Sequence, residues 1–251
     1  MRIASLTILG GRDKSGAPEL ERIDLAAGDT CCLVGPTGSG KSRLLADIEW
    51  LAQGDTPTAR RILLDGRPPN QAQREGLEGK WVAQITQNMN FVLDMSVMEF
   101  LRLHADSLGE TPEGDPVEMV VACANQLCGE PISPHSPLTS LSGGQSRSLM
   151  IADVACLGQT PVVLLDEIEN AGIHKTAALR LFSERGKILL LASHDPLLIL
   201  QAQSRVVIRN GGMVQVVRPA PEERECVHEL LAMDLRMAEL RSRLRAGLPV
   251  R

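Results

Sequence analysis

The sequence of 251 residues predicts an α/β fold with a mostly parallel sheet, an antiparallel β subdomain and an inserted α-helical subdomain. Three observations predict this class. Short apolar strands alternate with segments of helical periodicity, as in parallel sheets with helical crossovers. A glycine-rich loop directly joins a buried apolar strand to a helix. Residues 88–157 carry helical patterning between connectors that are rich in proline and glycine.

Strands dominate the first part of the chain. Alternating polarity predicts two strands on either side of a polar loop, and a compact apolar run predicts a buried strand before the glycine-rich loop. Helical periodicity follows that loop, and an edge strand then ends at the turn Asp65-Gly66. In order, we expect strands over 2–9, 20–25 and 30–34, a helix over 42–51 and a strand over 61–64.

The second part of the chain holds the predicted helical subdomain, at about 88–157, and returns to strands after it. Apolar residues open the subdomain, and an amphipathic pattern follows them. A hairpin around Asn210-Gly211-Gly212 closes the domain. The expected elements are helices over 116–127 and 146–157, buried strands over 161–165 and 188–192, and hairpin strands over 206–209 and 213–217.

The tail is predicted to be a single helix that begins at Pro221. We place the main domain at residues 1–217 and treat 218–251 as a C-terminal helical extension. Acidic residues in its first turn and arginines in its last turns suit the helix dipole. Two interpretations of its apolar stripe stay open: packing on its own domain, or a docking or dimer seam. The stripe has 4-3-4-3-4 spacing and consists of Cys226, Leu230, Met233, Met237, Leu240 and Leu244.

Composition limits the classes of function. Hydrophobic residues make up 43% of the chain and charged residues 23%, as in soluble globular proteins. Aromatic residues make up only 2%, without any tyrosine, so the core must be aliphatic. The formal net charge of −5 argues against a broad nucleic-acid-binding surface, because such a surface needs a basic face.

The sequence contains no apolar run of the roughly 20 residues that cross a bilayer, and its start is typical of a strand rather than a signal peptide. We therefore expect a cytoplasmic protein without a transmembrane segment, held at the inner face of a membrane only through a partner. The cysteines lack paired metal-ligand spacing, so reduced thiols are expected. These cysteines are Cys31, Cys32, Cys123, Cys128, Cys156 and Cys226.

The glycine-rich loop matches the phosphate-binding pattern G-x-x-x-x-G-K-[ST] and predicts a P-loop NTPase core. Its glycines let successive backbone N–H groups point at phosphates, and the helix start behind the loop adds unpaired donors. Lys41 can reach the β- and γ-phosphates of ATP, and the Ser42 hydroxyl can ligate Mg²⁺. The matching residues are Gly35, Pro36, Thr37, Gly38, Ser39, Gly40, Lys41 and Ser42.

Two acids end the apolar run at 162–165. Successive strand residues point in opposite directions, so Asp166 and Glu167 cannot share one role. Asp166 is placed to orient Mg²⁺ through its water shell. Glu167 is the better candidate to polarise the attacking water.

Between these motifs lies Leu141-Ser142-Gly143-Gly144-Gln145, and through this LSGGQ sequence the chain resembles the ATP-binding cassette (ABC) ATPase family. The segment offers a serine hydroxyl and backbone donors at a helix start. The resemblance implies that Ser142, Gly143, Gly144 and Gln145 of one subunit cap the ATP held by another. Two domains, identical or different, would then enclose two Mg-ATP at one interface.

The resemblance implies two further roles. Gln87 resembles the glutamine that contacts Mg²⁺ or water and links the core to the helical subdomain, with Gln84 as a competing candidate. His194 follows a buried strand and resembles the switch histidine that touches the γ-phosphate. We expect Glu167, His194 and Gln87 to be catalytic, and Ser42, Gln87 and Asp166 to hold the metal.

Three departures from the family pattern are present. Family members usually stack adenine on an aromatic residue, yet none precedes Trp50, which leaves Arg12 as a cation–π alternative. Arg43, counted here among the nucleotide-contacting residues, stands where threonine is common. The segment 168–174 is closer to that of some soluble cassette ATPases of DNA metabolism than to that of transporters.

The resulting hypothesis is an ATPase subunit that powers a partner, namely a separate membrane permease. The single-cassette length, Gln87 and the helical subdomain favour this function. An alternative is a soluble ABC ATPase that remodels or regulates a protein or nucleic-acid complex, favoured by 168–174 and by the tail. A nucleotide-binding module without turnover is disfavoured because Glu167 is present.

Overall fold

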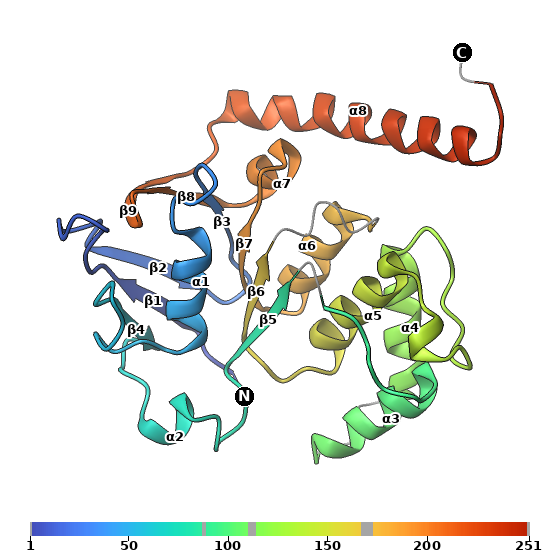
Figure 1. Ribbon diagram of the computed structural model, residues 1–251, viewed down its shortest axis with the longest axis horizontal. Helices are drawn as coiled ribbons and strands as arrows, with labels where there is room; N and C mark the ends of the chain where they lie inside the picture. The colour runs from blue at the N-terminus through green and yellow to red at the C-terminus, as the bar shows by residue number, and fades with distance from the viewer. Residues whose placement is uncertain (1, 87–88, 110–113, 167–172, 250–251) are drawn as a thin grey trace.

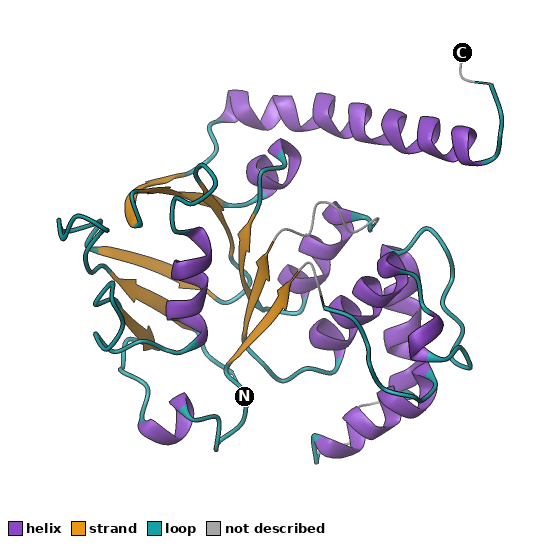
Figure 2. Ribbon diagram, viewed as in Figure 1, coloured by secondary structure: helices purple, strands orange, loops and turns teal. Residues whose placement is uncertain are grey.

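A computed structural model describes residues 2–86, 89–109, 114–166 and 173–249. It has two sheets with a helix between them and a separate group of helices beside the larger sheet (Figure 1, Figure 2). Among these residues, no helix combines the length and apolarity needed to cross a membrane.

The larger sheet has the strand order β5-β6-β7-β3-β8-β9, and only β9 runs antiparallel to its neighbour. The central strands are continuous apolar runs because helices cover both faces of the sheet. The same apolar runs predicted these strands from the sequence. Their bounds are β3 (Thr30–Val34), β5 (Val82–Thr86), β6 (Val162–Asp166), β7 (Ile188–Ala192), β8 (Ser204–Arg209) and β9 (Gly212–Val217).

The smaller sheet is antiparallel, with the order β2-β1-β4, and α1 (Lys41–Glu49) lies between it and the larger sheet (Figure 2). One core joins all three layers, and α1 contributes Leu44, Leu45 and Ile48 to it. The predicted antiparallel β subdomain and mostly parallel sheet are thereby confirmed. The strands are β1 (Ser5–Leu9), β2 (Arg22–Ala26) and β4 (Arg61–Leu64).

A second group of helices has a core of its own, to which Leu101, Val120 and Leu149 belong. It consists of α3 (Val97–Ser107), α4 (Pro116–Leu127) and α5 (Gly143–Cys156). Another face of α5 packs with α6 (Lys175–Glu184) in a core that also contains β6 and β7 residues. The His104 imidazole of α3 contacts Asp153 Oδ1 of α5 at 2.7 Å, and this hydrogen bond raises the pKa of His104.

The helix α5 begins three residues earlier than the sequence periodicity indicated. Ser142 caps it: the Gln145 N–H donates to Ser142 Oγ, and the Ser142 N–H donates to Gln145 Oε1. This capping box holds Gly143 and Gly144 in the first helical turn despite their low helix propensity. The short helices α2 (Gln71–Arg74) and α7 (Pro196–Gln201), together with α6, were not predicted.

The last helix, α8 (Pro221–Arg245), packs its first turns against α7, and its C-terminal part extends beyond α7 (Figure 1). Arg205 of β8 forms an ion pair with Glu223, which lowers the pKa of that carboxyl group. Val227 and Leu231 are half-buried, whereas Met233, Met237 and Leu244 of the apolar stripe are exposed. Packing on its own domain therefore accounts for only the first part of the tail.

The buried guanidinium group of Arg60 connects four segments of the chain. Arg60 donates to both carboxylate oxygens of Glu19 at 2.7 Å, to Asp47 of α1 at 3.0 Å and to the Gly211 carbonyl at 2.7 Å. Arg60 and Asp47 have no exposed side-chain surface, and Glu19 has 1%. Glu19 also accepts from the Gly11 and Met213 N–H groups. Two carboxylates in this Arg60 cluster face one buried guanidinium, and Arg43, 3.2 Å from Asp47, supplies the second positive charge.

Replacing Arg60 with Met should lower the free energy of unfolding by about 3–5 kcal/mol, because Glu19 would stay buried without a cation and Asp47 would keep only its ion pair with Arg43. Urea unfolding measures the change. The control is Arg22→Ala, which removes an exposed ion pair with Asp24 and should leave the urea midpoint nearly unchanged. Equal midpoints for both variants would contradict a central role for the Arg60 cluster.

Candidate functional site

The predicted site segments follow the carboxyl ends of four neighbouring strands, β5, β6, β7 and β3. In the sheet register, Asp166 at the end of β6 lies opposite Thr86 of β5 and Ala192 of β7. Ala192 in turn lies opposite Leu33 of β3, two residues before the phosphate loop. Ligands of open parallel sheets bind at this edge, so the register brings the predicted residues toward one place.

The phosphate loop has a backbone that depends on glycine. Gly38 and Gly40 have φ angles of 77° and 107°, in a region that other residues rarely adopt. The loop also lies directly against the β8–β9 turn: the Gly211 N–H donates to the Ser39 carbonyl at 2.7 Å. A Cβ on Gly40 would lie 2.7 Å from Gly211 Cα, so this position admits no side chain without movement.

Lys41 begins α1 and is 8% exposed. Its ammonium group donates to the carbonyl of Gly35 at 2.7 Å and to that of Pro36 at 3.3 Å, and lies 3.2 Å from His194 Nε2. The structure therefore brings the phosphate-loop lysine and the predicted switch histidine into direct contact. These two residues are 153 positions apart in the sequence.

The donors of the loop fit an anionic ligand such as the ATP phosphates. The start of α1 has no side-chain cap, because its N-cap residue is Gly40, and this leaves the first backbone N–H groups to a ligand. Ser39 Oγ is buried and has no hydrogen-bond partner among the described residues. Ser42 is exposed in the first turn of α1, where its hydroxyl can meet a metal ion beside the phosphates.

The acidic part of the site is only partly described. Asp166 is half-buried at the end of β6, whereas Glu167 and Gln87 lie outside the described residues. Gln84 pairs with Leu164 in the middle of β5, two residues before the strand ends. Gln84 is therefore part of the sheet ladder, and the choice between Gln84 and Gln87 remains a prediction.

The signature sequence and the phosphate loop of one chain are not brought together. Ser142 and Gly143 are exposed at the start of α5, in the helical group, whereas the phosphate loop joins β3 to α1 on the other side of the molecule (Figure 1). Among the residues with described placement, no hydrogen bond or ion pair links the two segments. The phosphate loop and the LSGGQ segment therefore lie at separate places on one chain.

Arg43 contacts residues of its own helix. The Arg43 guanidinium contacts Asp47 at 3.2 Å and lies 5.5 Å from the Trp50 ring centroid, toward the C-terminal end of α1. Its contact with nucleotide remains a prediction. Arg12 is exposed in the loop between β1 and β2.

Sequence reasoning missed Lys14, which donates to the Gly38 carbonyl of the phosphate loop at 2.8 Å. It also missed Lys175, which forms an ion pair with Asp195 directly after the switch histidine. Neither a lysine in a polar loop, such as Lys14, nor one at a helix start, such as Lys175, gives a local signal of its distant partner. The polar loop at 10–18 could have drawn attention to Lys14, because Arg12 of the same loop was already a candidate.

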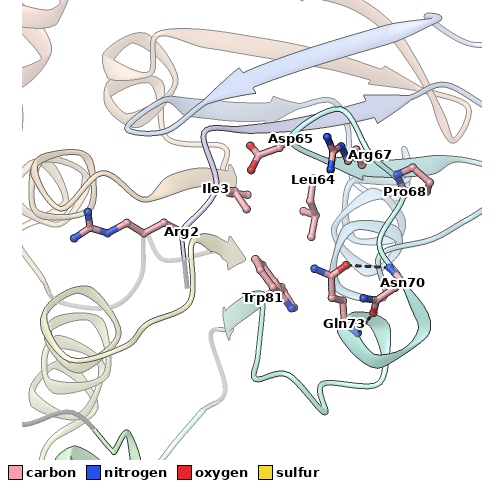
Figure 3. A pocket seen from close by; sticks show the side chains of 9 residues that line it. All are labelled: Arg2, Ile3, Leu64, Asp65, Arg67, Pro68, Asn70, Gln73 and Trp81. Carbon is pink, nitrogen blue, oxygen red and sulfur yellow. Dashed lines mark hydrogen bonds between the residues drawn. The ribbon is translucent and has the colours of Figure 1, made fainter.

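A cavity of about 540 Å³ lies away from this edge, beside the start of β5 (Figure 3). Trp81, directly before β5, forms one wall, and Asp65 and Arg67 after β4 form another. The phosphate loop and His194 follow the carboxyl ends of β3 and β7, whereas this cavity lies beside the amino end of β5. The cavity is therefore not part of the candidate site.

Comparison with known proteins agrees with this geometry. The family model of the ABC transporter matches residues 21–170. An uncharacterized ABC transporter ATP-binding protein of Methanocaldococcus jannaschii is 48% identical over 248 residues, or 98% of this chain and 95% of that protein. The methionine import ATP-binding protein MetN of Chlamydia pneumoniae is 30% identical over 86% of this chain and 66% of its own length.

Among solved structures, cbiO1 of Clostridium perfringens, part of the ABC transporter complex cbiONQ, has a TM-score of 0.66 at 22% identity. The alignment covers 96% of this chain and 100% of cbiO1, and it shows that the fold is shared. Fold and phosphate loop together define a P-loop ATPase with an α/β cassette. The chain belongs to the ABC transporter family, as an ATP-binding subunit with ATPase activity.

Replacing Gly40 with Ala should weaken binding of a fluorescent ATP analogue by more than about tenfold, because the added Cβ forces the β8–β9 turn off the phosphate loop. Fluorescence anisotropy measures this change. Gly16→Ala is the matched control: Gly16 has a φ of 85° but open space around its Cβ position. Equal binding of the analogue by both variants would show that the close approach of Gly40 to Gly211 is unimportant for binding.

Proposed function

We propose that two such domains, of one chain or of two related chains, close around two Mg-ATP. Each ATP would lie between Gly35–Ser42 of one domain and Ser142, Gly143, Gly144 and Gln145 of the other. The observation that supports this proposal is that the phosphate loop before α1 and the LSGGQ segment at the start of α5 lie at separate places on one chain. Residues 1–217 would form this cassette, with 88–157 as its helical subdomain and 218–251 as an extension.

Within each site, Ser42, Asp166 and Gln87 would hold Mg²⁺, which neutralises phosphate charge in reactions of this class. Glu167 would orient and polarise the attacking water. His194 would contact the γ-phosphate, a role supported by its position 3.2 Å from the Lys41 ammonium group. Catalysis by these residues consists mainly of positioning and charge stabilisation.

We further propose that the work of closure is delivered to a separate membrane permease, with this chain in the cytoplasm at the inner membrane face. The relatives are named as ATP-binding subunits of transport systems, for example of methionine import. The group α3–α5 is a suitable docking element because it has a core of its own beside the larger sheet. An alternative, remodelling of a soluble protein or nucleic-acid complex, is favoured by the exposed tail.

Glu167→Gln should abolish steady-state ATP hydrolysis and leave ATP affinity within about twofold, because only the water-polarising carboxylate is lost. Phosphate release and equilibrium binding of ATP measure the two effects. Nucleotide should also trap the two cassettes of the variant in the closed state, visible as slow release of bound ATP. Hydrolysis at the wild-type rate would remove Glu167 from the mechanism.

Ser142→Arg should stop hydrolysis by placing a bulky cation where the second domain has to close. ATP binding to the separate domain should persist, because Ser142 lies apart from the phosphate loop of its own chain. The control is Ser140→Arg, at an exposed position two residues before Ser142. A Ser142 variant with normal turnover would argue against a shared site.

The permease proposal is tested by affinity purification of the tagged full chain from detergent-solubilised membranes. A multi-span membrane protein should be recovered in stoichiometric amount. Recovery with soluble partners alone would support the remodelling function instead.

A further inference from the structure

The tail helix α8 presents an apolar surface that its own domain does not cover. We define the α8 seam as Cys226, Leu230, Met233, Met237, Leu240 and Leu244. Met233, Met237 and Leu244 are 63%, 48% and 64% exposed, and Cys226 is exposed even where α8 packs on α7. The seam residues Leu230 and Leu240 are half-buried, as are Val227 and Leu231, so the domain partly covers the start of the seam and leaves Met233, Met237 and Leu244 exposed.

The spacing of the α8 seam is the same read in either direction along the helix. If two copies of α8 align antiparallel about position 235, Cys226 faces Leu244, Leu230 faces Leu240 and Met233 faces Met237. Every seam residue then meets another seam residue, as in coiled coils with a 3.5-residue repeat. The arrangement has the two-fold symmetry of most homodimers, in which both copies use one surface.

Charges next to the α8 seam select the antiparallel orientation. Glu229 and Arg243 directly precede Leu230 and Leu244, so they flank the seam on the same side. Antiparallel alignment places Glu229 opposite Arg243 of the second copy, twice per pair. Parallel alignment would instead place Glu229 near Asp234 of the second copy, a repulsive contact. Arg236, in the middle of the flank, has its charge balanced by Glu239 of its own helix at 2.7 Å.

We propose that α8 pairs two copies of this chain as an antiparallel two-helix coil, without nucleotide. The occupant of the α8 seam is a second α8, because the seam and the Glu229–Arg243 flank are both complementary to themselves. This pairing is distinct from closure of the cassettes around ATP. It holds two copies together between rounds of nucleotide binding.

The first test is sedimentation equilibrium of the nucleotide-free full chain. The wild type should be dimeric. The dissociation constant of the dimer should rise by more than about tenfold in the double variant M233E/M237E, because unpaired charges are costly to bury. Leu235→Glu is the matched control, since Leu235 is 69% exposed on the opposite face of α8. A monomeric wild type, or equal weakening by the control, would overturn the proposal.

Charge reversal tests the orientation. Glu229→Arg alone should weaken self-association, and the double variant E229R/R243E should restore it, because the pairs re-form with exchanged signs. Failure of the double variant to recover would exclude the Glu229–Arg243 contact and, with it, the antiparallel register.

Thiol cross-linking gives an independent readout of the register. In the antiparallel pair the two Cys226 residues are about 27 Å apart, since 18 residues separate the ends of the seam. Mild oxidation should therefore cross-link the L244C variant through Cys226 but not the wild type, and C226S/L244C should remain uncross-linked. Wild-type cross-linking through Cys226 would indicate parallel helices and overturn the proposal.

These tests remain informative whether or not the cassettes close around ATP. Ser142→Arg, which should block closure, should leave the nucleotide-free dimer intact. Loss of that dimer in the Ser142 variant would assign self-association to the cassette face and overturn the role of α8.

Discussion

The geometry of the phosphate loop depends on one buried guanidinium group. Arg60 joins the β1–β2 loop through Glu19, the phosphate-loop helix through Asp47 and the β8–β9 turn through the Gly211 carbonyl. The same Gly211 peptide region then supports the loop, because its N–H donates to the Ser39 carbonyl. A buried cation is tolerated only when its ion-pair and hydrogen-bond partners are all in place, so these segments must assemble together. The antiparallel sheet is therefore linked to the phosphate loop through the Arg60 cluster.

The two glycine-containing helix starts differ in a way that suits their proposed tasks. Gly40 provides no side-chain cap for α1, and the free donors there await an anion. Ser142 caps α5 by a reciprocal hydrogen-bond pair with Gln145, so the signature helix is complete in the isolated chain. In the proposed shared site, the signature helix start would therefore need no repair on closure, and closure would only add contacts to the phosphates.

Much of this fold could be predicted because its signals are local. Central strands such as β3 and β7 are uninterrupted apolar runs, and the phosphate loop is a single contiguous pattern. The start of α5 was missed because its two glycines mask a helix that only the Ser142 cap stabilises. The contacts of Arg60, Lys14 and Lys175 could not be predicted, since their partners are distant in sequence and carry no periodicity. The sequence left both interpretations of α8 open, because spacing alone does not say which face is covered.

The β8–β9 turn has a consequence for protein engineering. Tight hairpin turns at a surface are ordinarily chosen for tags, probes or circular permutation, because few contacts depend on them. Here the turn residue Gly211 accepts from Arg60 on one side and donates to Ser39 on the other. A peptide inserted at this turn would disturb nucleotide affinity and thermal resistance together.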